Sequence, residues 1–301
     1  MEWVWIPITC AAAFFQMLRT AVQKQLKGVL STNGAAFTRF GFAVPVALLY
    51  GALLHWGWGL PWPTVPPEFV AWVTLGSVAQ ILATSLLLIA VTRQSFAIGT
   101  AYSKTEVVQA ALVEVAVLGY AITGQSAAAM ALATLGVMLT AMKDSRQPVQ
   151  ALVAGLADAG AWIGIAAGGL FGIAAVAFRA AALGLGDTTV AMAAAVTLIV
   201  STSLQTLLMA AWLVWREPEQ LPRIATHWRQ GALAGLTGAL ASACWFTAFT
   251  LTVAAYVRTL GLIELLFAYA ASMFWFRERV KPLELVGIGL LALGIAVLLQ
   301  R

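Results

Sequence analysis

The stretch AYSKTE occupies residues 101–106, and a near copy, AYVRTL, occupies residues 255–260. Each copy places a cation, Lys104 or Arg258, just inside a long apolar segment. The copies lie 154 positions apart, about half of the 301-residue chain. Because a charge inside a bilayer is costly, its recurrence at the same place indicates that the chain repeats one unit.

The composition assigns the chain to the membrane. Apolar residues make up 61% of it and charged residues 10%, and the mean hydropathy is +0.90. A soluble domain needs a surface with roughly 25% charged residues, so this chain must be solvated mostly by lipid. The sequence therefore predicts an all-α integral membrane protein. The net charge of +5 does not indicate nucleic-acid binding, because the cations follow the membrane loops.

Apolar segments separated by polar, glycine or proline residues predict ten transmembrane helices. The first opens with Glu2 rather than a basic region, so we interpret it as an uncleaved span and not as a signal peptide. The expected spans cover residues 3–25, 34–55, 68–91, 98–121, 126–142, 157–183, 189–215, 230–251, 255–276 and 282–299.

Positive charge is confined to alternate loops. The loops after the odd-numbered spans carry all the loop lysines and arginines, whereas those after spans 2, 4, 6 and 8 carry none. Such charge marks the cytoplasmic side of short loops. We therefore expect a multi-pass protein of a bacterial-type inner membrane, with both termini on the outer, periplasmic side.

Further matches support the internal repeat. LATSLLLIAV at 82–91 is similar to LASACWFTAF at 240–249, and Arg19 corresponds to Arg179 in a second pair. The sequence thus predicts one five-helix repeat at 1–142, a linker at 143–149 and a second repeat at 150–301. Because five is odd, the second repeat must enter from the opposite face, which gives an inverted repeat. The alternative is chance similarity among apolar helices.

The chain also resembles the EamA-type transporters of the drug/metabolite transporter (DMT) superfamily. The similarity rests on RF at 39–40 and on the block FRERVKPLELVGIGLLALGIAVLL at 276–299, which contains Glu278, Gly287 and Gly294. The first half departs from this pattern. Gly124 lies near the position where a glutamate is expected, and the first half has no second glycine that would accompany Gly136 as Gly294 accompanies Gly287. The resemblance implies transport of amino acids, metabolites, sugars or phosphorylated compounds through a cavity lined by helices 1, 3, 4, 6, 8 and 9.

Four cations inside the expected spans are candidates for substrate binding or gating. Arg19 and Lys104 are expected near the cytoplasmic face, and Arg179 and Arg258 near the outer face, as two layers exchanged by the repeat. One layer at each mouth suits a cavity that opens alternately to the two sides. Alternatively, these long side chains snorkel to the interface or form structural ion pairs.

The acidic residues inside the spans do not follow the repeat. Glu106 and Glu114 lie in the fourth span and Glu264 in the ninth. A substrate or a coupling proton is bound once, by an asymmetric set, so we nominate these three residues for proton coupling. The alternative is a static ion pair with a neighbouring cation. Glu106 and Gln109 share a helix face from which Lys104 points away, so Lys104 and Glu106 need not neutralise each other.

Polar and aromatic residues on the expected cavity helices complete a candidate binding surface for a small amphiphilic or zwitterionic solute. Each of them could instead serve packing or an interhelical hydrogen bond. They are Gln16, Gln80, Tyr102, Trp245 and Tyr256.

The preferred function is a secondary active transporter that exports a small-molecule substrate. We expect no enzymatic activity, no cofactor and no metal. The expected partners are the substrate and membrane lipids, and no nucleic acid. GxxxxGK[ST] is absent, so energy must come from an ion gradient or exchange. A lipid or lipid-linked sugar flippase is the alternative. A lipid-modifying enzyme is less favoured, because His55, His227, Cys10 and Cys244 form no ligand or nucleophile motif. Both cysteines are expected to be buried free thiols. We expect a monomer or homodimer.

Overall fold

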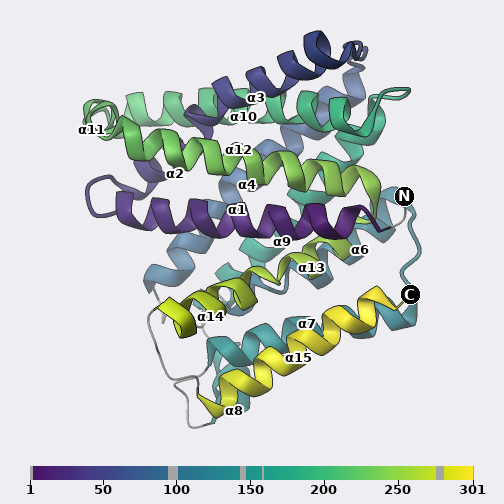
Figure 1. The fold of residues 1–301 in the computed structure, drawn as a ribbon. Coiled ribbons are helices and arrows are strands. Elements are labelled where there is room, and N and C mark those ends of the chain that lie inside the picture. The colour runs from purple at the N-terminus through teal and green to yellow at the C-terminus, as the bar shows by residue number, and fades with distance from the viewer. Residues whose placement is uncertain (1–2, 94–100, 143–146, 158, 276–280, 301) are drawn as a thin grey trace. The chain divides into compact units, whose positions relative to one another are not determined.

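The computed structural model describes residues 3–93, 101–142, 147–157, 159–275 and 281–300, and every regular element in these ranges is a helix (Figure 1). The elements are α1 (Trp5–Leu26), α2 (Thr32–Gly41), α3 (Ala43–Ala52), the π-helix η1 (Leu53–Gly57), α4 (Pro67–Arg93), α6 (Glu106–Leu118), α7 (Gly124–Ala141), α8 (Pro148–Gly155), α9 (Ala159–Gly184), α10 (Val190–Arg216), α11 (Gln220–Thr226), α12 (Trp228–Leu251), α13 (Ala254–Gly261), α14 (Glu264–Trp275) and α15 (Pro282–Leu299).

Eight of the ten expected spans correspond to helical stretches of the described residues that are long and apolar enough to cross a membrane. The remaining two segments, expected at 98–121 and 255–276, do not form one continuous helix each. A helical turn at 101–103 is separated from α6 by residues 104–105, and α13 is separated from α14 by residues 262–263. Each of these two expected spans is therefore interrupted, and the number of ten crossings stays a prediction.

Both breaks are tightened turns of 3₁₀ type, with hydrogen bonds between residues three apart. In the first, the N–H groups of Lys104 and Thr105 donate to carbonyls three residues earlier, at 3.1 and 3.2 Å. In the second, the N–H groups of Leu262 and Ile263 do the same, at 3.2 and 2.9 Å. Short 3₁₀ stretches inside a helix often mark a hinge, and apolar composition alone does not predict them.

Contacts divide the chain into two compact units that each draw on both halves of the sequence. Unit 1 consists of residues 1–77 and 177–251, and unit 2 of residues 78–176 and 252–301. Of the three boundaries along the chain, one falls within α4, one within α9 and one directly after α12, so α4 and α9 each contribute residues to both units.

In unit 1, α1 packs along α12, while α2, α3 and α10 pack against one another and against α12 (Figure 1). The second span bends where α2 gives way to α3. Pro45 has no N–H to bond the carbonyl of Gly41, which explains the interruption. The side chain of Phe42 at this bend lies in a notch on α12, because Cβ atoms added at Gly231 and Gly235 would lie only 2.6 and 2.4 Å from it.

In unit 2, α7 packs along α15 and α6 packs on α13 (Figure 1). The first pair crosses without intervening side chains. A Cβ on Gly136 would lie 2.6 Å from the carbonyl oxygen of Gly287, and a Cβ on Gly287 would lie 2.6 Å from that of Gly136. Gly294 approaches Ala133 in the same way. Small residues at these crossings let the two backbones touch.

Candidate transport site

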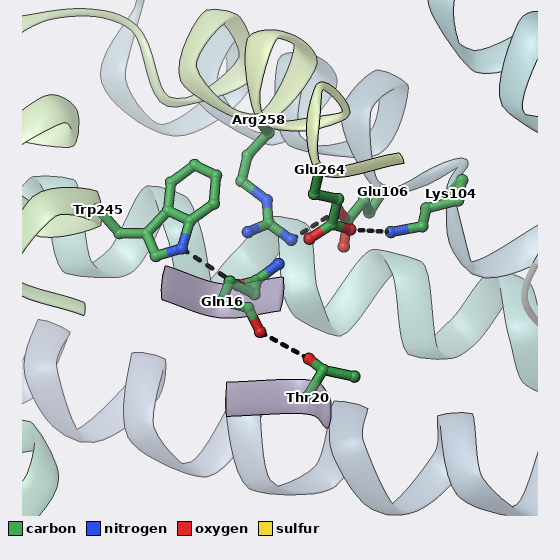
Figure 2. A network of polar contacts seen from close by, with 7 residues as sticks. All are labelled: Gln16, Thr20, Lys104, Glu106, Trp245, Arg258 and Glu264. Atoms are coloured by element: carbon green, nitrogen blue, oxygen red, sulfur yellow. Dashed lines mark hydrogen bonds and ion pairs between the residues drawn. The ribbon is translucent and has the colours of Figure 1, made fainter. Parts of the chain in front are cut away.

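Four ionisable side chains gather at the two helix breaks of unit 2. The Lys104 ammonium donates to Glu264 Oε1 at 3.0 Å, and the Arg258 guanidinium donates to Glu106 Oε1 at 2.5 Å (Figure 2). Each pair therefore joins a cation from one broken segment to a carboxylate from the other. We call Lys104, Glu106, Arg258 and Glu264 the ion-pair cluster.

The helix breaks explain why these residues occupy these positions. Glu106 is the first residue of α6 and Glu264 is the first residue of α14, where a carboxylate is favoured by the positive end of the helix dipole. Arg258 lies in the last turn of α13, where a cation is favoured. Lys104 lies in the turn just before α6. Breaking a helix thus creates charge-stabilising ends in the middle of an apolar segment.

The ion-pair cluster is largely withdrawn from solvent. Side-chain exposure is 17% for Lys104 and 18% for Glu264, and it is 16% for Arg258 and 7% for Glu106. Removing such charges from water is expensive, and it is tolerated where each has an opposite partner with good geometry. The cluster contains two cations and two carboxylates, so its formal charges cancel.

Lys104 and Arg258, which were expected in layers near opposite membrane faces, both take part in the ion-pair cluster, each through a carboxylate of the other broken segment. The two layers relative to the membrane stay a prediction. The pairing agrees with the expectation that Lys104 and Glu106 need not neutralise each other. It also gives Glu264 the ion-pair partner that the alternative interpretation proposed.

The first break is held against α9. Gln109 donates through its side-chain amide to the Thr105 hydroxyl at 2.8 Å and to the carbonyl of Ile165 in α9 at 3.1 Å. Gly168 lies one helical turn further along α9, where an added Cβ would lie 2.7 Å from the Ser103 carbonyl oxygen. The backbone of α9 thus directly contacts the turn that carries Lys104.

Glu114 lies at a different position from the ion-pair cluster. Its side chain is fully buried, and its Oε2 accepts a hydrogen bond from the backbone N–H of Ala255 at 3.1 Å. Ala255 is the second residue of α13, so a carboxylate of α6 caps the start of another helix. Two further candidates, Tyr102 and Tyr256, are buried in the same unit, and the Tyr102 ring packs against Gly155 of α8.

The two remaining candidate arginines lie in unit 1 and are both buried. Arg179 of α9 donates to the carbonyl of Phe249, one of the last four residues of α12, where helix carbonyls lack helical partners. Arg19 of α1 lies beside Arg39 of α2, and both pack against Gly238 of α12. The structure therefore places two of the four candidate cations in each unit.

Gln16 and Trp245 meet in unit 1. The indole N–H of Trp245 donates to Gln16 Oε1 at 3.1 Å, and its ring stacks on Phe249 (Figure 2). Gln80, in the part of α4 that belongs to unit 2, is half-buried, and its carbonyl accepts from the Thr84 hydroxyl at 2.8 Å. The interhelical hydrogen bond that sequence reasoning weighed as an alternative is thus present for Gln16 and Trp245.

Comparison with known proteins identifies the second half of the chain. Residues 156–300 match the model of the EamA-like transporter family. This second half of the chain is similar to the EamA-like transporter family. The resemblance expected from the last hairpin is confirmed, although Glu278 lies outside the described residues. The match and the eight long apolar helices together support a multi-pass membrane protein and suggest a transporter.

The fold of the EamA-like chain is shared by solved structures, of which 28 chains match it. One crystal structure aligns with a TM-score of 0.73 over 99% of this chain and 98% of its own, at 14% identity. At that identity the likeness concerns the fold alone. No protein with a curated description matches the EamA-like chain.

Sequence reasoning missed one polar cluster of the EamA-like chain, at the start of α2 in unit 1. The Glu217 carboxylate accepts from the Ser31 hydroxyl and, at 2.6 Å, from the Asn33 amide, while Gln220 accepts from the Ser31 N–H at 2.8 Å. The run Ser-Thr-Asn-Gly at 31–34 is a helix-start signal that could have found half of this cluster. Its partners lie about 185 residues away, which no local pattern indicates.

Proposed function

We propose that this EamA-like protein is a secondary active transporter that exports a small amphiphilic or zwitterionic solute, such as an amino acid, by alternating access. The observation that carries the proposal is the ion-pair cluster at two helix breaks. Breaks in transmembrane helices commonly form the substrate sites of transporters, because they present helix ends and charged groups within the membrane. An ionisable residue inside a membrane span is by default a candidate for a functional site.

The neutral sum of the cluster favours a solute that carries both charges. A solute carboxylate can replace Glu106 at Arg258, and a solute ammonium can replace Lys104 at Glu264. Such an exchange breaks two internal ion pairs and forms two with the solute, and it frees Glu106 and Lys104, which have opposite charges and must then pair with each other to leave no buried charge without a partner. A singly charged solute would leave one cluster residue uncompensated.

Two features of unit 2 support an inverted repeat with ten crossings. Lys104 and Arg258, which correspond in the repeat, each bind a carboxylate of the other broken segment. Gly136 and Gly287, about half the chain apart, make reciprocal contacts of equal length. Contacts between corresponding residues are expected near a pseudo-two-fold axis, where one repeat moves against the other during transport. We propose that the two broken segments supply the fourth and ninth crossings.

We propose that a proton gradient drives the cycle through a carboxylate of the ion-pair cluster, Glu106 or Glu264. When a proton replaces a cation as the partner of a carboxylate, the cation becomes available to the solute. Glu264 is the leading candidate, because its ion pair is the more exposed of the two. A carboxylate that water can reach is able to exchange its proton as the protein opens to either side.

A direct test traps the dye pyranine inside proteoliposomes and adds a panel of amino acids outside. A proton-coupled transporter should change the internal pH with a subset of them, and the response should disappear when a protonophore equalises the two sides. No response to any amino acid in a sample of properly folded protein would contradict the proposed solute class. Scrambling of a fluorescent phospholipid in the same vesicles would favour the flippase instead.

Replacing Glu264 by glutamine should abolish the pH-driven response while leaving the protein folded. Glutamine keeps an oxygen acceptor for Lys104 but cannot take up and release a proton. The matched control is Glu68→Gln at the exposed start of α4, which should respond like the wild type. An unchanged proton response in Glu264→Gln would remove Glu264 as the coupling residue.

We also propose an inner-membrane location with both chain ends on the periplasmic side, supported by the lysines and arginines of alternate loops. A single cysteine placed at either end should react with an impermeant maleimide in intact spheroplasts. Labelling of one end only would mean an odd number of crossings and would contradict the inverted arrangement.

A further inference from the structure

Glu114 has a distinct geometry among the buried carboxylates of the two broken segments. Glu106 and Glu264 bind cationic side chains, whereas the carboxylate of Glu114 accepts the backbone N–H of Ala255 at 3.1 Å. Its side chain is fully buried, in contrast to the partly exposed Lys104–Glu264 pair. A group enclosed to this degree is poorly placed to exchange protons with water.

The start of α13 needs an acceptor from outside the helix. The first N–H groups of a helix lack partners within it, and burying them without a partner is costly. The residue before α13, Val253, provides no side-chain cap, and Ala254, Ala255 and Tyr256 are all buried. The N–H of Tyr256 bonds the Val253 carbonyl at 3.0 Å, and Glu114 supplies from α6 the acceptor for the N–H of Ala255.

Glu114 and Glu106 hold α13 at two points. They lie eight residues apart on α6, a spacing that puts both on one helix face about 12 Å apart. Glu114 binds the start of α13 at Ala255, and Glu106 binds Arg258 in its last turn. Because α13 is only eight residues long, a fixed start also fixes the position of the Arg258 guanidinium.

We propose that Glu114 is a positioning residue, which caps α13 and thereby holds Arg258 against Glu106, and that it does not carry the coupling proton. The proposal assigns the three buried carboxylates to different tasks, with Glu114 anchoring a helix and the ion-pair cluster engaging the solute. It rests on the proposed function only in taking Arg258 as part of the transport site.

Hydrogen–deuterium exchange of the α13 backbone tests the anchoring without any solute. In the full-length protein in lipid nanodiscs, Glu114→Ala should raise the exchange of α13 amides about tenfold, the effect of losing a helix cap. Glu114→Gln keeps an oxygen acceptor and should restore exchange to within about twofold of the wild type. The matched control is Glu284→Ala, which removes the carboxylate that accepts from the Lys281 N–H at the start of α15. It should raise exchange in α15 and leave α13 unchanged.

The pyranine assay then separates positioning from proton transfer. Glu114→Gln should keep the proton response that Glu264→Gln loses. If Glu114→Gln abolishes that response, or if Glu114→Ala leaves α13 exchange at the wild-type rate, the positioning role is wrong. If Glu114→Ala does not fold, Glu114→Gln still decides, because accelerated α13 exchange in that variant would also contradict the proposal. Should the wild type show no proton response, the proposed function fails while the exchange result on Glu114 stands.

Discussion

The segments 101–118 and 254–275 begin with the same pattern, Ala-Tyr-x-cation-Thr, and both are broken, yet the break comes at different distances from the cation. In the first segment the helix is interrupted at Lys104 itself. In the second, α13 continues three residues beyond Arg258 before it ends. The carboxylate that follows each break, Glu106 or Glu264, is consequently two residues from the cation in one segment and six in the other.

This difference separates what the repeat preserves from what it does not. The cations stay in register, so each segment presents one positive charge. The carboxylates are out of register, so Lys104 and Arg258 acquire partners of different position and burial. Glu114 has no acidic counterpart in 254–275, where the corresponding residue is Ala268. Two repeats with cations in register can undergo equivalent movements, while carboxylates that are out of register bind a solute in one orientation.

Replacing Arg258 by alanine should produce the largest change. It leaves Glu106 buried without its cation, and the free energy of unfolding should fall by about 3 kcal/mol. Lys104→Ala should cost about 1 kcal/mol, because Glu264 is more exposed and can be hydrated. Unfolding in mixed detergent micelles measures both. Arg258→Met combined with Glu106→Leu should recover most of the loss, and equal losses in the two single variants would remove the energetic distinction between the pairs.

Gly168→Ala should come next, with a loss of about 2 kcal/mol. The added methyl would lie 2.7 Å from the Ser103 carbonyl oxygen and 3.1 Å from the Glu106 nitrogen, so α9 must move away from the first break. Gly184→Ala is the control on the same helix, since an added Cβ there meets no atom within 4 Å. If both variants unfold alike, the contact of α9 with the break is not tight.

The smallest effect is expected at the end of α6. Gly119 caps this helix with φ of 69°, a left-handed conformation, whereas the residue that caps α13, Leu262, has a φ of −60°. Gly119→Ala should lower the free energy of unfolding by about 1 kcal/mol through backbone strain alone, because nothing lies near an added Cβ. Gly124→Ala has the same open space without the positive φ and should be near neutral. A thermal shift in Gly119→Ala no larger than that of Gly124→Ala would contradict the strain.

The sequence predicted the helical membrane fold, the positions of eight spans and the recurrence of the cations, because apolar length and charge cost are local properties. It did not predict that the segments around Lys104 and Arg258 are broken, since a 3₁₀ turn needs no special residue when packing supports it. The sequence also did not predict which carboxylates pair with those cations. Glu106 and Arg258 are 152 residues apart, and only the fold decides which carboxylate meets which cation.

The hydrogen bond from Ala255 to Glu114 also could not be predicted from the sequence. A carboxylate in the middle of an apolar segment suggests a proton-binding site, because sequence patterns describe side chains and not the backbone N–H groups that bind them. Cys10 and Cys244 illustrate the opposite case. They were expected to be buried free thiols, because they have no ligand spacing in the sequence; in the structure both are free but only half-buried.

The contact of α7 with α15 has a consequence for measuring motion. Because Gly136 and Gly287 bring the two backbones together, neither helix can slide without displacing main-chain atoms of the other. The two helices must travel as one rigid rod. Spin labels placed on both helices should therefore keep a constant separation throughout a transport cycle. The helix pair can then serve as a fixed reference against which the displacement of other parts of the chain is measured.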